Sequence, residues 1–180
     1  CYFPAAGLRG LWISPYLAER FGADLSLIGT ATLVMGLAMV AGNFLYGPAD
    51  LLLGSRKGPI LAGNFGVAAL CLVFWAMPPS SAAGAITMFA LIGLLGASYP
   101  IVLSHGRSFC PPHLTGRGVT LLNLFGMGGA GVMQFASGPG FAALAETRSP
   151  ADAYGALFGL IGLVILAGLA VYLWSEDRTG

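Results

Sequence analysis

Long runs without a charged side chain set the strongest limit on how this chain folds. Residues 25–49, 118–145 and 153–175 contain no Asp, Glu, Lys or Arg. A helix needs roughly 20 predominantly apolar residues to cross the hydrocarbon core of a bilayer, which is about 30 Å thick. Each of these runs therefore predicts one membrane-spanning helix.

Two further stretches raise the number of expected spans to six. The uncharged stretch 58–106 is too long for one crossing, and the sequence "MPPSSAAG" at 77–84 divides it into two apolar segments. The opening run, 1–18, is apolar except for Arg9 and predicts a first span. We therefore expect an all-α polytopic membrane protein, one domain over residues 1–180, with helices at about 1–18, 26–48, 58–77, 84–104, 116–143 and 152–174.

The composition agrees with a membrane protein and excludes other classes. Hydrophobic residues make up 57% of the chain, charged residues 8%, and the mean hydropathy is +0.83. A soluble domain carries charge on about 25% of its residues. The net charge of +1 provides no basic surface for a nucleic acid, so no nucleic-acid partner is expected. Three widely spaced cysteines predict no disulfide framework.

Two short motifs resemble ligand sites but lack the context that such sites need. Gly126, Gly128 and Gly131 have the G-x-G-x-x-G spacing of a dinucleotide-binding turn, yet they lie inside an uncharged span with no room for a strand. We expect them to let helices pack closely. The stretch 105–113, "HGRSFCPPH", contains two His and one Cys but no fourth ligand, so no metal and no cofactor are expected.

The basic residues predict the orientation of the chain. Cytoplasmic connections of membrane proteins carry an excess of Lys and Arg. Most of the Lys and Arg residues lie in the second and fourth connections and in the tail: Arg56, Lys57, Arg107, Arg117 and Arg178. This distribution predicts that the even-numbered connections and both termini face the cytoplasm.

Amide side chains inside the spans are candidates for function. Asn123 and Gln134 are eleven residues apart, which at about 100° per residue places them on nearly the same helix face. Because amides are costly against lipid, they are expected to point into the bundle. They either bond neighbouring helices or line a substrate path. Asn43 and Asn64 are expected to bond between helices.

Three polar or aromatic residues of the first span have the spacing of one helix face. Arg9, Trp12 and Tyr16 stand at i, i+3 and i+7. Arg9 is either an intramembrane charge or a side chain that reaches the cytoplasmic interface. In the fourth span, Tyr99 belongs to a Gly-rich, Pro-interrupted segment, 93–100, that either bends or packs closely.

The connection between the second and third spans resembles a family signature. The sequence "GPADLLLGSRK", 47–57, is similar to the cytoplasmic loop of the major facilitator superfamily, with Asp50 one position early and Leu51 in place of a basic residue. The residues that match by type are Gly47, Asp50, Gly54, Arg56 and Lys57. The sequences "PPHLTGRGVTLLN", 111–123, and "GLWISPYLAERFG", 10–22, resemble the start of the fifth helix of a facilitator half and the seventh helix of bacterial twelve-helix members.

This resemblance implies that the chain is a fragment, the carboxyl-terminal six-helix half of a transporter in a bacterial cytoplasmic membrane. The half would be a 3+3 inverted repeat, pair with a missing amino-terminal half and move a small solute by alternating access, with a proton or ion as possible coupling partner. It implies no enzymatic activity. The first, second, fourth and fifth helices would line the cavity, which gives the substrate-cavity candidates Arg9, Trp12, Tyr16, Asn43, Tyr99, Asn123 and Gln134.

Two other functions fit six spans. One is a structural or receptor-like membrane protein that transports nothing. The other is a rhomboid-type intramembrane serine protease, because "GASYP" at 96–100 is close to the nucleophile signature of that family. Such a protease needs a His in a later span, whereas His105 and His113 lie in the fourth connection.

Overall fold

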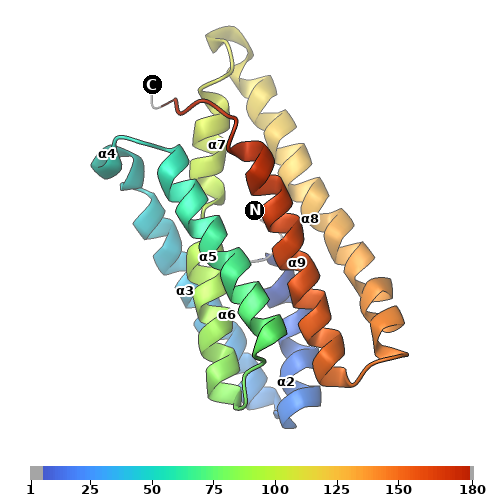
Figure 1. The fold of residues 1–180 in the computed structure, drawn as a ribbon. Coiled ribbons are helices and arrows are strands. Elements are labelled where there is room, and N and C mark those ends of the chain that lie inside the picture. The colour runs from blue at the N-terminus through green and yellow to red at the C-terminus, as the bar shows by residue number, and fades with distance from the viewer. Residues whose placement is uncertain (1–5, 179–180) are drawn as a thin grey trace.

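The chain is a bundle of helices (Figure 1). The computed structural model describes residues 6–178, apart from the side chains at positions 50 and 51. No strand occurs between residues 6 and 178, so the glycine spacing at 126–131 belongs to a helix, as expected. The elements are the π-helical turn η1 (Leu8–Trp12), α2 (Ile13–Phe21), α3 (Leu25–Tyr46), α4 (Ala49–Leu53), α5 (Lys57–Ala76), α6 (Ala82–Gly96), α7 (Tyr99–Arg107), the 3₁₀ helix η2 (Pro112–Leu114), α8 (Thr115–Ala145) and α9 (Pro150–Tyr172).

Five helical segments of the described chain are long and apolar enough to cross a membrane. They are Leu25–Tyr46, Lys57–Ala76, Ala82–Arg107, Pro112–Ala145 and Pro150–Tyr172. These segments correspond to the last five expected spans. The expected first span, 1–18, begins outside the described residues, and its described part, η1 and α2, ends at Phe21. The protein is therefore an all-helical membrane protein with five such helices in its described part.

Side chains at the connections fix where the helices begin. Asp24 accepts a hydrogen bond from the Leu27 amide at 2.8 Å and caps α3. Ser81 caps α6 by accepting from the Gly84 amide at 3.2 Å, and Ser149 caps α9 by accepting from the Asp152 amide at 3.3 Å. An oxygen at the position before a helix satisfies an amide that has no partner within the helix. The caps explain why these three helices start within two residues of the expected positions.

Glycines let α3 approach α6 closely. A Cβ atom on Gly42 of α3 would collide with the Leu94 carbonyl oxygen and lie 2.7 Å from the Ala97 Cβ. A Cβ atom on Gly93 of α6 would lie 2.9 Å from the Met35 carbonyl oxygen. Membrane helices without a hydrophobic driving force between them gain contact by this kind of backbone approach. The α3–α6 pair is therefore held at a distance that only glycine permits.

An aromatic cluster forms the centre of the packed core. Tyr16 lies edge-on to Phe74, Phe89 and Tyr154, with ring centroids 5.6, 5.6 and 5.2 Å apart. Phe158 of α9 joins the cluster, 4.9 Å from Phe74. Edge-to-face pairs at these separations are favoured by the charge distribution of the rings. The cluster joins α2, α5, α6 and α9 in one core.

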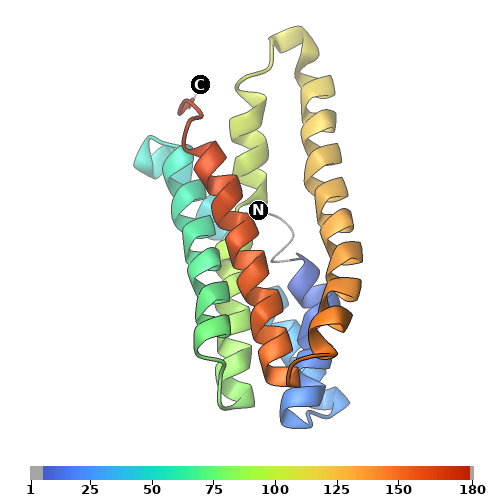
Figure 2. The same ribbon diagram turned by 45° about the vertical axis from the view of Figure 1, so that its right-hand side comes forward.

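Two helices lie at the margin of this core. Only 17% of the apolar window of α3 and 6% of that of Pro112–Ala145 are buried, against 44%, 39% and 50% for the other three spans. Figure 2 shows α8 along one side of the bundle, beside α9 and connected to α7. Most of the surface of α3 and α8 is thus uncovered in this chain.

Candidate functional site

A hydrogen bond joins two of the polar residues that the sequence singles out. The Tyr99 hydroxyl, at the start of α7, donates to Oδ1 of Asn123 on α8 at 2.9 Å. Asn123 Nδ2 donates to the Val119 carbonyl of its own helix at 3.2 Å. A Cβ atom on Gly126 would lie 2.5 Å from the Tyr99 hydroxyl oxygen, so glycine at this position gives the tyrosine its place against α8.

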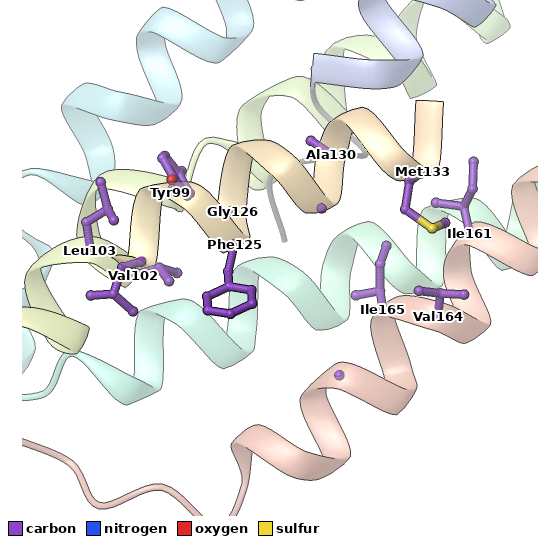
Figure 3. A pocket seen from close by; sticks show the side chains of 13 residues that line it. Tyr99, Val102, Leu103, Phe125, Gly126, Ala130, Met133, Ile161, Val164 and Ile165 are labelled. Carbon is purple, nitrogen blue, oxygen red and sulfur yellow. The ribbon is translucent and has the colours of Figure 1, made fainter. Parts of the chain in front are cut away.

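An apolar cleft of about 320 Å³ lies beside this pair, between α7, α8 and α9 (Figure 3). Tyr99 is its most polar lining residue, and Phe125 and Val164, which also line it, are exposed. The lining residues are Tyr99, Val102, Leu103, Leu122, Phe125, Gly126, Gly129, Ala130, Met133, Ile161, Val164, Ile165 and Gly168. A surface of this kind suits an apolar group with one hydrogen-bonding end.

Three other candidates lie on the weakly buried side of the bundle. Arg9 is exposed, and its Nη1 lies 3.3 Å from where a Cβ atom on Gly36 of α3 would stand. Gln134 of α8 lies next to η1, with Nε2 3.8 Å from the Cβ position of Gly10. Asn43 is exposed and donates to the Met39 carbonyl of its own helix at 3.0 Å, so the expected bond to another helix is not observed among the side chains that the structure describes.

The remaining two candidates are buried in the core. Trp12 is 5% exposed and its Nε1 donates to the Ser137 hydroxyl at 3.1 Å, while Tyr16 is 1% exposed within the aromatic cluster. The expected common face of Arg9, Trp12 and Tyr16 is not observed. The reason is the π-helical turn Leu8–Trp12, because its i→i+5 bonds change the angle between successive residues. The proposed cavity roles of Trp12 and Tyr16 stay predictions.

A buried polar pair, Asn64 and Ser98, lies at the break between α6 and α7. Asn64 Nδ2 donates to the Ser98 hydroxyl at 3.0 Å, which is the bond between helices expected of Asn64. Both residues are buried, at 1% and 0% exposure. The Tyr46 hydroxyl donates to the Leu95 carbonyl at 2.7 Å and satisfies a group that the break leaves unpaired. Ser98, the serine of the protease hypothesis, therefore has an asparagine as its partner.

The loop that resembles the facilitator signature holds a carboxylate that the sequence did not single out. Gly54 ends α4 with a φ of 59°, which turns the chain toward α5. The Ser55 hydroxyl then donates to Oδ2 of Asp177 at 2.5 Å, and the amides of Arg56 and Lys57 donate to Oδ1 at 3.2 and 3.1 Å. Gly47 is the C-cap of α3, and the side chain of Asp50 lies outside the described residues.

This arrangement gives Asp177 the role of a cap for α5. The Ser55 hydrogen bond lowers the pKa of Asp177 below its ordinary value of 3.8, and the backbone amides of Lys57 and Arg56 act in the same direction. A carboxylate at the amino end of a helix also gains from the helix dipole. The loop thus binds an anionic group through one hydroxyl and two amides.

Two more side chains fasten the segment 173–178 to the same end of the bundle. Lys57 Nζ donates to the Leu173 and Ser175 carbonyls, both at 2.6 Å. His105, which is 2% exposed, bonds through Nε2 to the Glu176 carbonyl at 3.0 Å and through Nδ1 to the Tyr172 hydroxyl at 2.6 Å. We call Ser55, Lys57, His105, Tyr172 and Asp177 the end clamp. It ties α5, α7 and α9 together.

No group of three His, Cys, Asp or Glu residues within the described part of the chain is placed to hold a metal ion. His105 belongs to the end clamp, whereas His113 is exposed on η2. No protein-family model matches the chain, and no curated protein matches its sequence.

Proposed function

We propose that this chain is the carboxyl-terminal half of a secondary transporter of the major facilitator type, which moves a small solute across a bacterial cytoplasmic membrane by alternating access. The transporter would be completed by an amino-terminal six-helix half. A proton or another ion is the expected coupling partner.

One observation carries this proposal. The two least buried spans, α3 at 17% and Pro112–Ala145 at 6%, are also those that carry Asn43, Asn123 and Gln134. A polar group facing hydrocarbon is costly, so a helix that bears amides and is largely uncovered needs either a protein partner or water beside it. A central cavity between two halves supplies both. Arg9, exposed next to α3, adds a charge to the same region.

The accessibility of Gln134 to water tests this cavity. We expect Gln134→Cys, in a complete protein whose native cysteines are replaced by serine, to react with a water-soluble maleimide, because a cavity residue faces water. Leu163→Cys on α9 is the control. Leu163 is 51% exposed and thus more open than Gln134 in this chain, but it is expected to face lipid. Equal, slow reaction at both positions would count against a water-filled cavity beside α8.

The orientation is tested by a second pair of single cysteines. The α7–α8 connection lies at the same end as the end clamp and most basic residues, and it is expected to face the cytoplasm. An impermeant reagent added to intact cells should therefore label Ser80→Cys, in the α5–α6 connection, and spare His113→Cys. Both residues are exposed, so burial does not decide the result. Labelling of His113→Cys alone would reverse the proposed orientation.

A further inference from the structure

A cavity of about 500 Å³ lies at the end of the bundle where α7 gives way to α8. It is separate from the apolar cleft of Figure 3 and shares no lining residue with it. Two parts of the chain that are distant in sequence meet there: the α4–α5 connection, and the stretch that runs from the end of α7 to the start of α8. The lining residues are Arg56, Ser104, Arg107, Ser108, Cys110, Pro112 and Thr115.

The described lining of this cavity is basic. Two guanidinium groups, of Arg56 and Arg107, line it, and none of the carboxylates that the structure describes does. Arg107 is exposed and makes no hydrogen bond or ion pair with any residue between 6 and 178 whose side chain is described. Arg56 is held in position, because its amide donates to Asp177 and its Nη1 donates to the Ser104 carbonyl at 3.5 Å. The nearby Asp177 carboxylate already accepts bonds from Ser55 and Lys57.

The start of α8 adds further hydrogen-bond donors. This helix is 31 residues long, and Leu114 before it offers no side-chain cap. The first amides of a helix and its dipole attract anions. Ser108 and Thr115 donate their hydroxyl hydrogens to the His105 and Pro111 carbonyls, so the Arg107 guanidinium group and the start of α8 are the main donors for a ligand, with the Arg56 guanidinium group, already bonded to the Ser104 carbonyl, beside them.

We propose that this cavity binds a phosphate group, and that an anionic phospholipid of the membrane supplies it. Planar guanidinium groups bind phosphate oxygens through paired hydrogen bonds, which favours phosphate over a simple halide. The cavity lies where two spans end, at the level of lipid head groups. Basic pockets between helices on the cytoplasmic side take anionic head groups. This inference does not depend on transport.

The experiment measures lipid binding to the full purified chain in detergent by native mass spectrometry. The probes are phosphatidylglycerol, phosphatidylcholine and inorganic phosphate. We expect phosphatidylglycerol to bind more tightly than phosphatidylcholine, and Arg107→Gln to weaken phosphatidylglycerol binding by about 10-fold, the loss of one charge-assisted contact. Melting temperature should barely change, because the Arg107 side chain has no partner to lose in the described chain.

Arg148→Gln is the matched control. Arg148 is also exposed and lines a cavity, of about 400 Å³, but Asp152 shares that lining. Its replacement should change phosphatidylglycerol binding by less than about twofold. Equal binding by the parent and Arg107→Gln, or an equal loss in both variants, would overturn the site. Binding of inorganic phosphate that is as tight and as sensitive to Arg107→Gln as that of the lipid would overturn the lipid as its source.

Discussion

Replacing Gly42 by alanine is expected to lower the free energy of unfolding by about 1–3 kcal/mol, the usual cost of forcing an extra methyl group into a packed interface. The new Cβ atom would collide with the Leu94 carbonyl oxygen and lie 2.7 Å from the Ala97 Cβ. Both are backbone or near-backbone atoms, so no side-chain rotation relieves the contact. The helices α3 and α6 must move apart instead. The difference in the free energy of unfolding is measured by titrating both proteins, in micelles, with a denaturing detergent.

Gly29→Ala on the same helix is the control for this effect. A Cβ atom at Gly29 meets no other atom within 4 Å. Alanine favours a helix over glycine by about 1 kcal/mol, so this variant should be as stable as the parent or slightly more so. If both variants unfold alike, close approach of α3 and α6 does not contribute to stability.

Asp177→Asn is expected to lower the free energy of unfolding by about 1 kcal/mol, the typical value of a helix cap, since water screens this exposed carboxylate. The asparagine keeps one acceptor oxygen but loses the charge at the start of α5 and the second acceptor. Amide hydrogen exchange should become faster at Arg56 and Lys57, because in the parent protein both amides donate to Asp177.

The effect of Asp177 depends on pH in a defined direction. Its pKa in the folded chain lies below the ordinary value of 3.8, with the Ser55 hydrogen bond as the main cause. Above pH 3.8 the carboxylate is ionised in both folded and unfolded chains, and its stabilising contribution is complete. As the pH falls through the lowered pKa, the contribution disappears. The difference between the parent and Asp177→Asn should therefore shrink in acid.

Glu176→Gln separates this cap from a general loss of charge. Glu176 is the neighbour of Asp177, but its carboxylate pairs with Arg178 at 2.7 Å on the surface, with both side chains largely exposed. Exposed pairs contribute about 0–1 kcal/mol, so this variant should be close to the parent at every pH. A similar loss in both variants would mean that the tail charge, and not the cap, stabilises α5.

Charge-free runs in the sequence were sufficient to predict most of the membrane architecture. The expected span 58–77 is α5, Lys57–Ala76, and the expected span 152–174 is α9, Pro150–Tyr172. These boundaries follow from local properties, namely the length of an apolar run and the residues that cap or interrupt it. The short helix α4 in the second connection was not expected, since a five-residue helix leaves little periodicity to read.

The polar contacts were less predictable because they depend on which helices become neighbours. The bond between Asn64 and Ser98 spans 34 residues, and that between Ser55 and Asp177 spans 122. Nothing in the sequence around Asp177 distinguishes it from Glu176 as the carboxylate that meets the loop. The π-helical turn of η1 was also not predictable from residue spacing, and it contains both the exposed Arg9 and the buried Trp12, which the spacing of a regular α-helix places on one face.

The interruption at Ala97 and Ser98 divides the fourth span into two helices, α6 and α7, that have different neighbours. α6 is fixed against α3 through Gly93, whereas α7 is bonded to α8 through Tyr99 and Asn123. Tyr46 bonds the Leu95 carbonyl and Asn64 bonds the Ser98 side chain, each bond being worth about 1 kcal/mol, so a change of the angle between α6 and α7 acts against these two bonds. Any tilt of α7 consequently carries α8 with it and has to break the bonds of His105 that tie α7 to α9 in the end clamp.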